Sequence, residues 1–178
     1  MSDVRFNADG LALSERYAET MDEYVLPGIN ARRRDETISG DGGRPLFTSR
    51  FDAQDPVGSV LIVHGFTENA DKFSELIHSL LTCHYSVLAY DQRGHGRSWR
   101  APGLAEDSVT HVDDFEEYVR DLEIVADRLL ASMPKPWFLF AHSMGGAVSL
   151  LFLERHNGVF ARAAMCAPMV APNLGGLP

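Results

Sequence analysis

The chain has 178 residues, a formal net charge of −9 and 45% hydrophobic residues, which together exclude several classes of protein. This length is typical of one domain and is sufficient for a substantial core. An excess of acidic residues argues against nucleic acid as a partner, because acidic surfaces repel phosphate backbones. No apolar run approaches the ~20 residues that span a bilayer, and the N-terminus does not resemble a secretory signal. The sequence predicts a cytoplasmic protein without a transmembrane segment, for which peripheral membrane contact stays open.

The N-terminal part of the chain carries weak secondary-structure signals. Residues 11–25 predict a helix that ends before the Pro-Gly pair at 27–28. Turn signals at 41–43 and 55–56 flank an expected edge strand at 45–52. These turns predict an antiparallel hairpin at the start of the sheet.

From residue 59 onward, short apolar runs alternate with segments of helical periodicity. Such runs fit strands that are buried on both faces, and the alternation of strands and helices builds a parallel sheet. A capping box of Thr110 and Asp113 is expected to begin the second helix of this region. The expected strands are 59–63, 85–90, 137–141 and 161–167, and the expected helices are 70–81, 115–129 and 144–154. The predicted fold class is therefore α/β.

The two cysteines, Cys83 and Cys166, stand in apolar sequence surroundings. Their separation matches no metal-binding pattern. We expect both to be buried, reduced thiols that behave as small hydrophobic residues, and not a disulfide or redox pair.

The segment Phe-Ala-His-Ser-Met-Gly-Gly at residues 140–146 lies between an expected strand and an expected helix. A serine on so tight a turn presents its hydroxyl beside the free N–H groups of the helix N-terminus, which suit an oxyanion. Small residues are needed two places before and after it, and Ala141 and Gly145 meet that need, while Gly146 allows close helix packing. Ser143 is therefore a candidate nucleophile, with a helix-capping serine as the alternative interpretation.

Two further motifs follow the first two parallel strands. His-Gly-Phe-Thr at 64–67 closes the first strand, and Asp-Gln-Arg-Gly-His-Gly-Arg-Ser at 91–98 leaves the next. Ligands of open α/β sheets bind at this edge. Together with 140–146, these motifs resemble the α/β-hydrolase superfamily and, within it, the monoacylglycerol lipase and lysophospholipase (lysophospholipase L2-like) group. The likeness covers residues 47–168.

The resemblance implies an α/β-hydrolase fold and a serine hydrolase that cleaves carboxylic esters, such as lysophospholipids or monoacylglycerols, through an acyl-enzyme. It implies no metal and no organic cofactor. The implied roles are Ser143 as nucleophile, the backbone N–H groups of Phe66 and Met144 as the oxyanion hole, Ala141, Gly145 and Gly146 as support of the serine turn, and His64 and Gly65 as support of the oxyanion loop.

In this family the catalytic Asp and His follow the serine in the chain. The only histidine downstream of Ser143 is His156, at the far end of an expected helix that is about 15–20 Å long, so it cannot reach the serine hydroxyl. We therefore expect the chain to be the N-terminal part of a longer enzyme, truncated before the lid and the last strands, and to be inactive alone.

The expected organisation is one domain over residues 1–178, with a peripheral segment at 1–44, a core at 45–168 and the start of a lid or linker at 169–178. Besides a small lipid-like ester, the expected partner is the missing C-terminal part as a second polypeptide, or a second copy at the open sheet edge. The alternative function is a catalytically incomplete fragment or a non-catalytic binding or dimerising module of the same fold.

Overall fold

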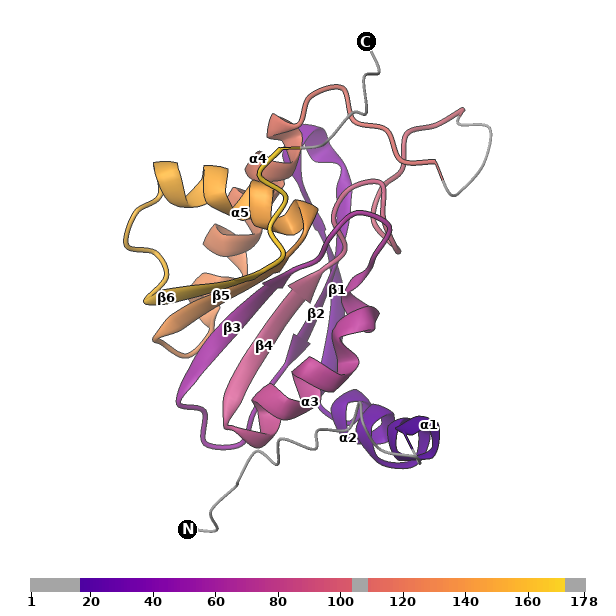
Figure 1. Ribbon diagram of the computed structural model, residues 1–178, viewed down its shortest axis with the longest axis vertical. Coiled ribbons are helices and arrows are strands. Elements are labelled where there is room, and N and C mark those ends of the chain that lie inside the picture. Colours follow the sequence, from indigo (N-terminus) through magenta and orange to yellow (C-terminus); the bar gives the residue numbers. More distant parts are fainter. Residues whose placement is uncertain (1–16, 104–108, 172–178) are drawn as a thin grey trace.

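The computed structural model describes residues 17–103 and 109–171, which form a six-stranded sheet with helices on both faces (Figure 1). The strand order is β1-β2-β4-β3-β5-β6, in which β4, β3, β5 and β6 are parallel and the β1–β2 hairpin joins β4 in the antiparallel sense. The strands are β1 (Arg33–Ser39), β2 (Pro45–Phe51), β3 (Gly58–Val63), β4 (Tyr85–Tyr90), β5 (Trp137–His142) and β6 (Arg162–Cys166). The predicted α/β class, with a mostly parallel sheet and an N-terminal hairpin, is confirmed.

Two groups of helices cover the two faces of the sheet. The N-terminal helix and α3 pack on one face, whereas α4 and α5 pack on the other (Figure 1). The helical segments are α1 (Tyr17–Thr20), η2 (Met21–Val25), α2 (Leu26–Asn30), η3 (Asp41–Gly43), η4 (Ala70–Phe73), α3 (Ser74–Thr82), α4 (Glu116–Arg128), η5 (Leu130–Ser132) and α5 (Met144–Arg155). No helix in the described part of the chain is long and apolar enough to span a bilayer.

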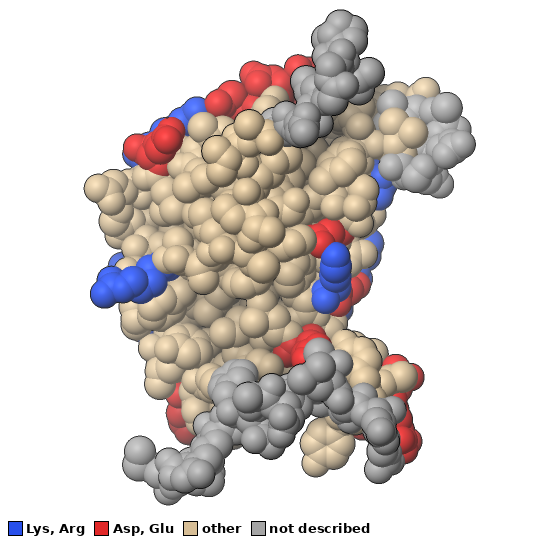
Figure 2. Space-filling model, in the orientation of Figure 1, with Lys and Arg blue, Asp and Glu red and all other residues tan. Residues whose placement is uncertain are grey.

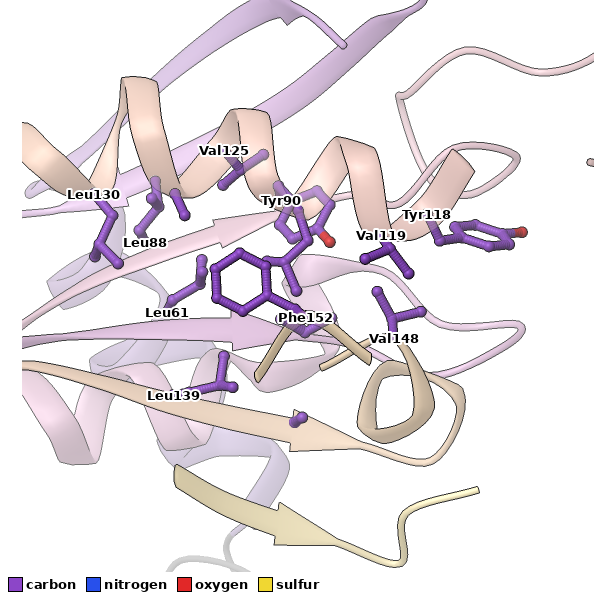
Figure 3. Close-up of a cluster of buried hydrophobic side chains, with 14 of the residues drawn as sticks. Leu61, Leu88, Tyr90, Tyr118, Val119, Val125, Leu130, Leu139, Val148 and Phe152 are labelled. Carbon is purple, nitrogen blue, oxygen red and sulfur yellow. The ribbon is translucent and has the colours of Figure 1, made fainter. Parts of the chain in front are cut away.

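The central strand β3 shows why a continuous apolar run predicts a buried parallel strand. Successive side chains of a strand point to opposite faces, so Leu61 and Val63 enter the core beneath α4 and α5 (Figure 3). Val60 and Ile62 enter the second core, beneath α3. Every residue of β3 is buried, and the strand ends at the loop that carries His64.

The N-terminal helix differs from its prediction. Residues 11–16 lie outside the described part of the chain, and the helix continues through 27–28 to Asn30 instead of ending before Pro27. A wide π turn precedes the proline, in which the Leu26 N–H donates to the Met21 carbonyl. Pro27 then occupies the first turn of α2, where the missing N–H costs nothing.

The prediction that 45–52 forms an edge strand is wrong. β2 lies between β1 and β4, and the turn at 41–43 joins it to β1. β1 is the outer strand instead, within the segment expected to be peripheral. Its sequence, Arg-Arg-Asp-Glu-Thr-Ile-Ser, has no apolar pattern that would predict a strand. An edge strand tolerates charged side chains that an inner strand does not.

The predicted capping box before α4 is also wrong. The Thr110 hydroxyl donates to the Gly94 carbonyl at 3.0 Å and so holds the loop after β4. The first turn of the helix is instead satisfied by Asp114, whose carboxylate accepts a hydrogen bond from the Glu116 N–H at 3.0 Å.

The cysteines are both free thiols, as expected, but neither is buried: Cys83 is half-buried and Cys166 is exposed. Cys166 ends β6, the outer strand of the described sheet. Because the far side of β6 meets no other described strand, the apolar sequence around Cys166 is not covered.

Candidate active site

Ser143 occupies a strained turn between β5 and α5. Its backbone has φ 50° and ψ −120°, which non-glycine residues rarely adopt and which costs about 1–3 kcal/mol. The turn is held by the neighbouring strand, since the Ser143 N–H donates to the Cys166 carbonyl at 3.1 Å and the Ser143 carbonyl accepts from the Met169 N–H at 2.9 Å. The half-buried serine is thereby fixed at the N-terminus of α5.

Two glycines allow α5 to begin against the ends of neighbouring strands. A Cβ on Gly145 would lie 2.3 Å from the Val63 carbonyl oxygen and 2.4 Å from that of His64. A Cβ on Gly146 would lie 2.6 Å from the Pro168 Cβ. Any larger residue at 145 would push the helix N-terminus away from the loop after β3. Ala141, the small residue before the turn, is fully buried on β5.

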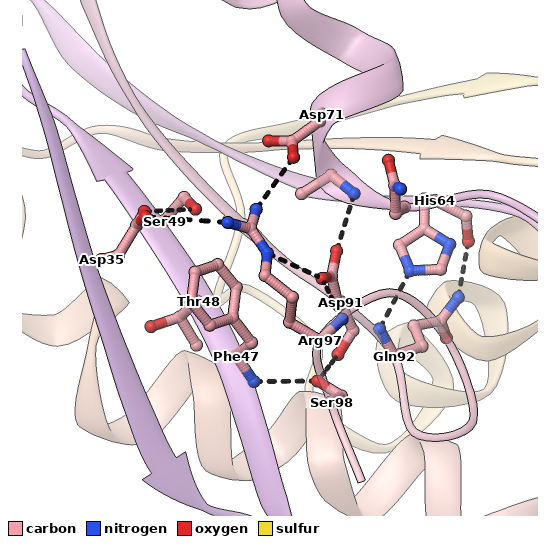
Figure 4. A network of polar contacts seen from close by, with 12 residues as sticks. Asp35, Phe47, Thr48, Ser49, His64, Asp71, Asp91, Gln92, Arg97 and Ser98 are labelled. Atoms are coloured by element: carbon pink, nitrogen blue, oxygen red, sulfur yellow. Dashed lines mark hydrogen bonds and ion pairs between the residues drawn. The ribbon is translucent and has the colours of Figure 1, made fainter. Parts of the chain in front are cut away.

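His64 joins the loop after β3 to the loop after β4. Its Nε2 accepts a hydrogen bond from the Gln92 N–H at 2.9 Å, and the Gln92 side-chain amide donates to the His64 carbonyl at 2.6 Å (Figure 4). Its Nδ1 lies 2.7 Å from the Gly65 carbonyl, so the ring is the neutral tautomer with the proton on Nδ1. Burial lowers the pKa of His64 to about 4.

This depressed pKa predicts acid sensitivity. The ordinary pKa of histidine is 6.5, so between pH 6.5 and 4 the unfolded chain binds a proton that the folded chain rejects. The stabilisation is complete above pH 6.5 and is lost as the pH falls to 4, at a cost of about 3 kcal/mol. Urea unfolding at a series of pH values should show this decline, and the variant His64→Asn should show a flatter one. Equal slopes in the two proteins would contradict the assignment.

The loop after β4 is fixed by Asp91. Its Oδ1 accepts from the Ala70 N–H at 2.8 Å and its Oδ2 from the Arg97 N–H at 2.9 Å (Figure 4). Gly96 has φ +49°, and a Cβ there would lie 2.1 Å from Oδ2 of Asp91. The Asp-Gln-Arg-Gly-His-Gly-Arg-Ser motif thus has a structural function, which is to hold this loop against the start of η4, the short helix that leads into α3.

The expected oxyanion donors lie on two segments that touch. Among the described residues, neither the Phe66 N–H nor the Met144 N–H has a hydrogen-bond acceptor; Met144 is the first residue of α5, where N–H groups lack helical partners. A Cβ on Gly65 would lie 2.9 Å from the Ser143 Cβ, so the oxyanion loop abuts the serine turn. Phe66, beside it, is 52% exposed.

Glu68 is a site residue that the sequence reasoning missed. One carboxylate oxygen accepts from the Gly65 N–H at 2.7 Å and from His142 Nδ1 at 2.8 Å, and the other pairs with Lys72. Burial alone would raise the pKa of Glu68, but the bonds from Lys72, His142 and Gly65 outweigh it and hold the pKa at about 2. The available signal was an acidic residue three positions after Gly65, in the segment that follows β3.

No histidine of the described segments activates Ser143. All seven histidines are described, and none is hydrogen-bonded to the Ser143 hydroxyl. His142 is bonded to Glu68, and His156, directly after α5, is bonded to Glu123 at 2.8 Å. The described residues also contain no group of three or more His, Cys, Asp or Glu that could hold a metal ion.

Comparison with known proteins shows the family to which this chain belongs. The family model described as serine aminopeptidase, S33, matches residues 54–177, and the chain belongs to this family of α/β hydrolases. It is 41% identical over 142 residues to lysophospholipase L2 of Escherichia coli, covering 78% of this chain and 41% of that protein. It is 33% identical over 119 residues to human monoglyceride lipase, covering 66% of this chain and 37% of the lipase.

Solved structures share the fold. An esterase from Exiguobacterium antarcticum aligns with a TM-score of 0.63 at 21% identity, over 77% of this chain and 46% of the esterase. An epoxide hydrolase from Vigna radiata aligns with a TM-score of 0.60 at 21% identity, over 76% of this chain and 40% of that enzyme. The chain spans about two fifths of the length of the curated relatives it matches.

Proposed function

We propose that this protein is a serine hydrolase that cleaves carboxylic esters with a lipid-like acyl group, of the lysophospholipid or monoacylglycerol kind. The observation that carries the proposal is the positive φ of Ser143 at the start of α5, directly against the loop that presents the Phe66 N–H. A serine that only capped the helix would accept a hydrogen bond from its first turn, and no such bond is present. The names of the relatives, lysophospholipase L2 and monoglyceride lipase, support an ester substrate.

In the proposed mechanism, the Ser143 hydroxyl attacks the ester carbonyl carbon while a base takes its proton. The N–H groups of Phe66 and Met144 stabilise the negative charge that develops on the carbonyl oxygen. The intermediate collapses when the C–O bond breaks and the leaving alcohol takes the proton from the base. Water then attacks the acyl-enzyme in the same way, which releases the carboxylic acid and restores Ser143.

The base and its acidic partner come, in this proposal, from polypeptide that covers the open side of β6. The outer edge of β6 meets no described strand. Beside it, a cavity of about 250 Å³ is lined mainly by apolar residues of β3, β5, β6 and α3, and Figure 2 shows few charged side chains over this part of the surface. The relatives are more than twice as long as the matched segment, so a continuation of the fold is the proposed occupant, and a second copy of the chain is the alternative.

A fluorophosphonate ester tests the proposal. The purified protein, with any polypeptide that accompanies it, is treated with the reagent and its intact mass is measured under denaturing conditions. We expect an adduct on the 178-residue chain that maps to Ser143, together with a second or longer polypeptide that supplies the base. Absence of an adduct on a folded sample that also contains the polypeptide covering β6 would refute the hydrolase proposal. It would favour the non-catalytic module, for which self-association at β6 is the expected property.

The family description raises one alternative substrate class, the amide bond of a peptide. Both reactions use an acyl-enzyme, so Ser143 alone does not separate them. A p-nitrophenyl ester of a medium-chain fatty acid and an aminoacyl p-nitroanilide, assayed side by side, distinguish the two. The proposal expects turnover of the ester; preferential turnover of the anilide would contradict it.

A further inference from the structure

Glu68 is a buried carboxylate whose role the proposed mechanism does not use. Only 5% of its side chain is exposed. The carboxylate folds back onto the N–H of Gly65 at 2.7 Å and so closes the loop that contains Phe66. Thr67, inside this loop, has φ 60°, a conformation that the closed loop must maintain.

The same carboxylate oxygen reaches the segment that carries the serine. It accepts a hydrogen bond from His142 Nδ1 at 2.8 Å, and His142 directly precedes Ser143. The His142 ring is also fixed by the Phe73 ring, whose centroid lies 6.3 Å away in an edge-on arrangement. Glu68 therefore connects the oxyanion loop to the serine turn, while Lys72 neutralises its second oxygen.

The hydrogen bonds of the sheet do not link the oxyanion loop to the serine turn. The β3–β5 ladder has its last pair at Val63 and Ala141, so the two segments leave the ladder immediately before His64 and His142. The oxyanion donors lie beyond that point, one on each segment. Stabilisation of a tetrahedral oxyanion requires both N–H groups to be aimed at one position, and an error of about 1 Å can cost about 100-fold in rate.

We propose that Glu68 is a positioning residue that fixes the Phe66 N–H relative to Ser143 and the Met144 N–H, through its hydrogen bonds to Gly65 and His142. This role rests on the proposed hydrolase function. Glu68 touches no reacting atom in it; it sets the distance between the two halves of the oxyanion hole.

Four variants test the role. Glu68→Ala removes the connection, and His142→Phe breaks it from the other side. His142→Asn keeps a donor near the position of Nδ1, and Glu36→Gln, on the exposed face of the edge strand β1, is the control. The measurements, made on the protein together with the polypeptide that supplies the base, are kcat and KM for a short p-nitrophenyl ester and the rate of fluorophosphonate labelling. The thermal midpoint of each variant is measured as well.

We expect Glu68→Ala and His142→Phe each to lower kcat about 10- to 100-fold with little change in KM. Both substitutions break the same link between the oxyanion loop and the serine turn. The kcat of the double variant should therefore be little lower than that of either single variant. His142→Asn and Glu36→Gln should stay close to wild type. Equal kcat in wild type and in both disrupting variants would overturn the proposal, and so would a double variant whose losses simply multiply. If Glu68→Ala does not fold, the kcat of His142→Phe tests the proposal instead.

Amide hydrogen exchange separates this proposal from the hydrolase proposal. The Gly65 N–H is bonded to Glu68, so Glu68→Ala should accelerate its exchange at least about 10-fold, given the loss of a charge-assisted hydrogen bond. This result does not depend on catalysis. If the wild type is unreactive in the presence of the polypeptide that supplies the base, while Glu68→Ala accelerates exchange, the hydrolase proposal alone would end. Unchanged exchange in Glu68→Ala would end the role of Glu68 even in an active enzyme.

Discussion

In the protein assembled with the polypeptide that supplies the base, replacement of Ser143 by alanine is expected to lower ester hydrolysis by at least about 10⁴-fold, because the variant lacks the hydroxyl that attacks the ester carbonyl. The alanine methyl group fits where the serine Cβ lies, and the backbone is held by its bonds to Cys166 and Met169. Folding should therefore change little. The measurement is steady-state hydrolysis of a p-nitrophenyl ester alongside fluorophosphonate labelling.

Ser149 provides a matched control in the same helix. Its buried hydroxyl has no hydrogen-bond partner among the described residues, so Ser149→Ala should keep both stability and activity. Hydrolysis that survives Ser143→Ala would show that the activity belongs to another group or another protein. A similar loss in Ser149→Ala would point instead to a general disturbance of α5.

The second large effect concerns stability. Arg93 and Asp121 are both only 1% exposed and form a bidentate pair, with Nε–Oδ2 at 2.6 Å and Nη2–Oδ1 at 2.8 Å. Asp121 also accepts a hydrogen bond from the Asp41 N–H at 2.8 Å. The pair thus joins α4, the loop after β4 and the turn between β1 and β2.

Arg93→Met leaves the Asp121 carboxylate buried without its cation. We expect the free energy of unfolding to fall by about 3–5 kcal/mol, because an uncompensated buried charge costs far more than the pair contributes. Urea denaturation at pH 7 measures the change. The control is Arg120→Met, which removes a partly exposed ion pair between α4 and Asp41 and should cost about 1 kcal/mol or less. Equal losses in the two variants would show that burial of Arg93 does not decide its contribution.

The hydrophobic periodicity of the sequence predicted most strands of the sheet. It failed for elements whose structure depends on residues outside the element itself. β3 to β5 and the helices α3 to α5 are readable because each buries a run of apolar residues with the period of its own structure. β6 is readable from its apolar residues alone, since four of its five residues are exposed. β1 is not readable, since an edge strand needs no apolar face. The N-terminal helix passes Pro27 because a π turn places the proline at a new first turn, which no local rule anticipates.

The serine motif was visible for the same reason. Its small residues are required by a turn whose geometry is local, so the sequence alone predicts the glycine at 145, although the carbonyls that it makes room for belong to Val63 and His64. Glu68 and His142 were not paired in advance, because 74 positions separate them in the chain. Only the parallel arrangement of β3 and β5 brings their loops together.

The sequence by itself determined the α/β class, the alternation of strands and helices, and the candidate nucleophile. Each of these depends on residues that are close together in the sequence. The tertiary structure decided which loops meet at the edge of the sheet, which charges are buried together and which strand is left uncovered. These features depend on strand order, and the order is set by the packing of the two cores on the faces of the sheet. Contacts between distant residues form only when those faces are buried.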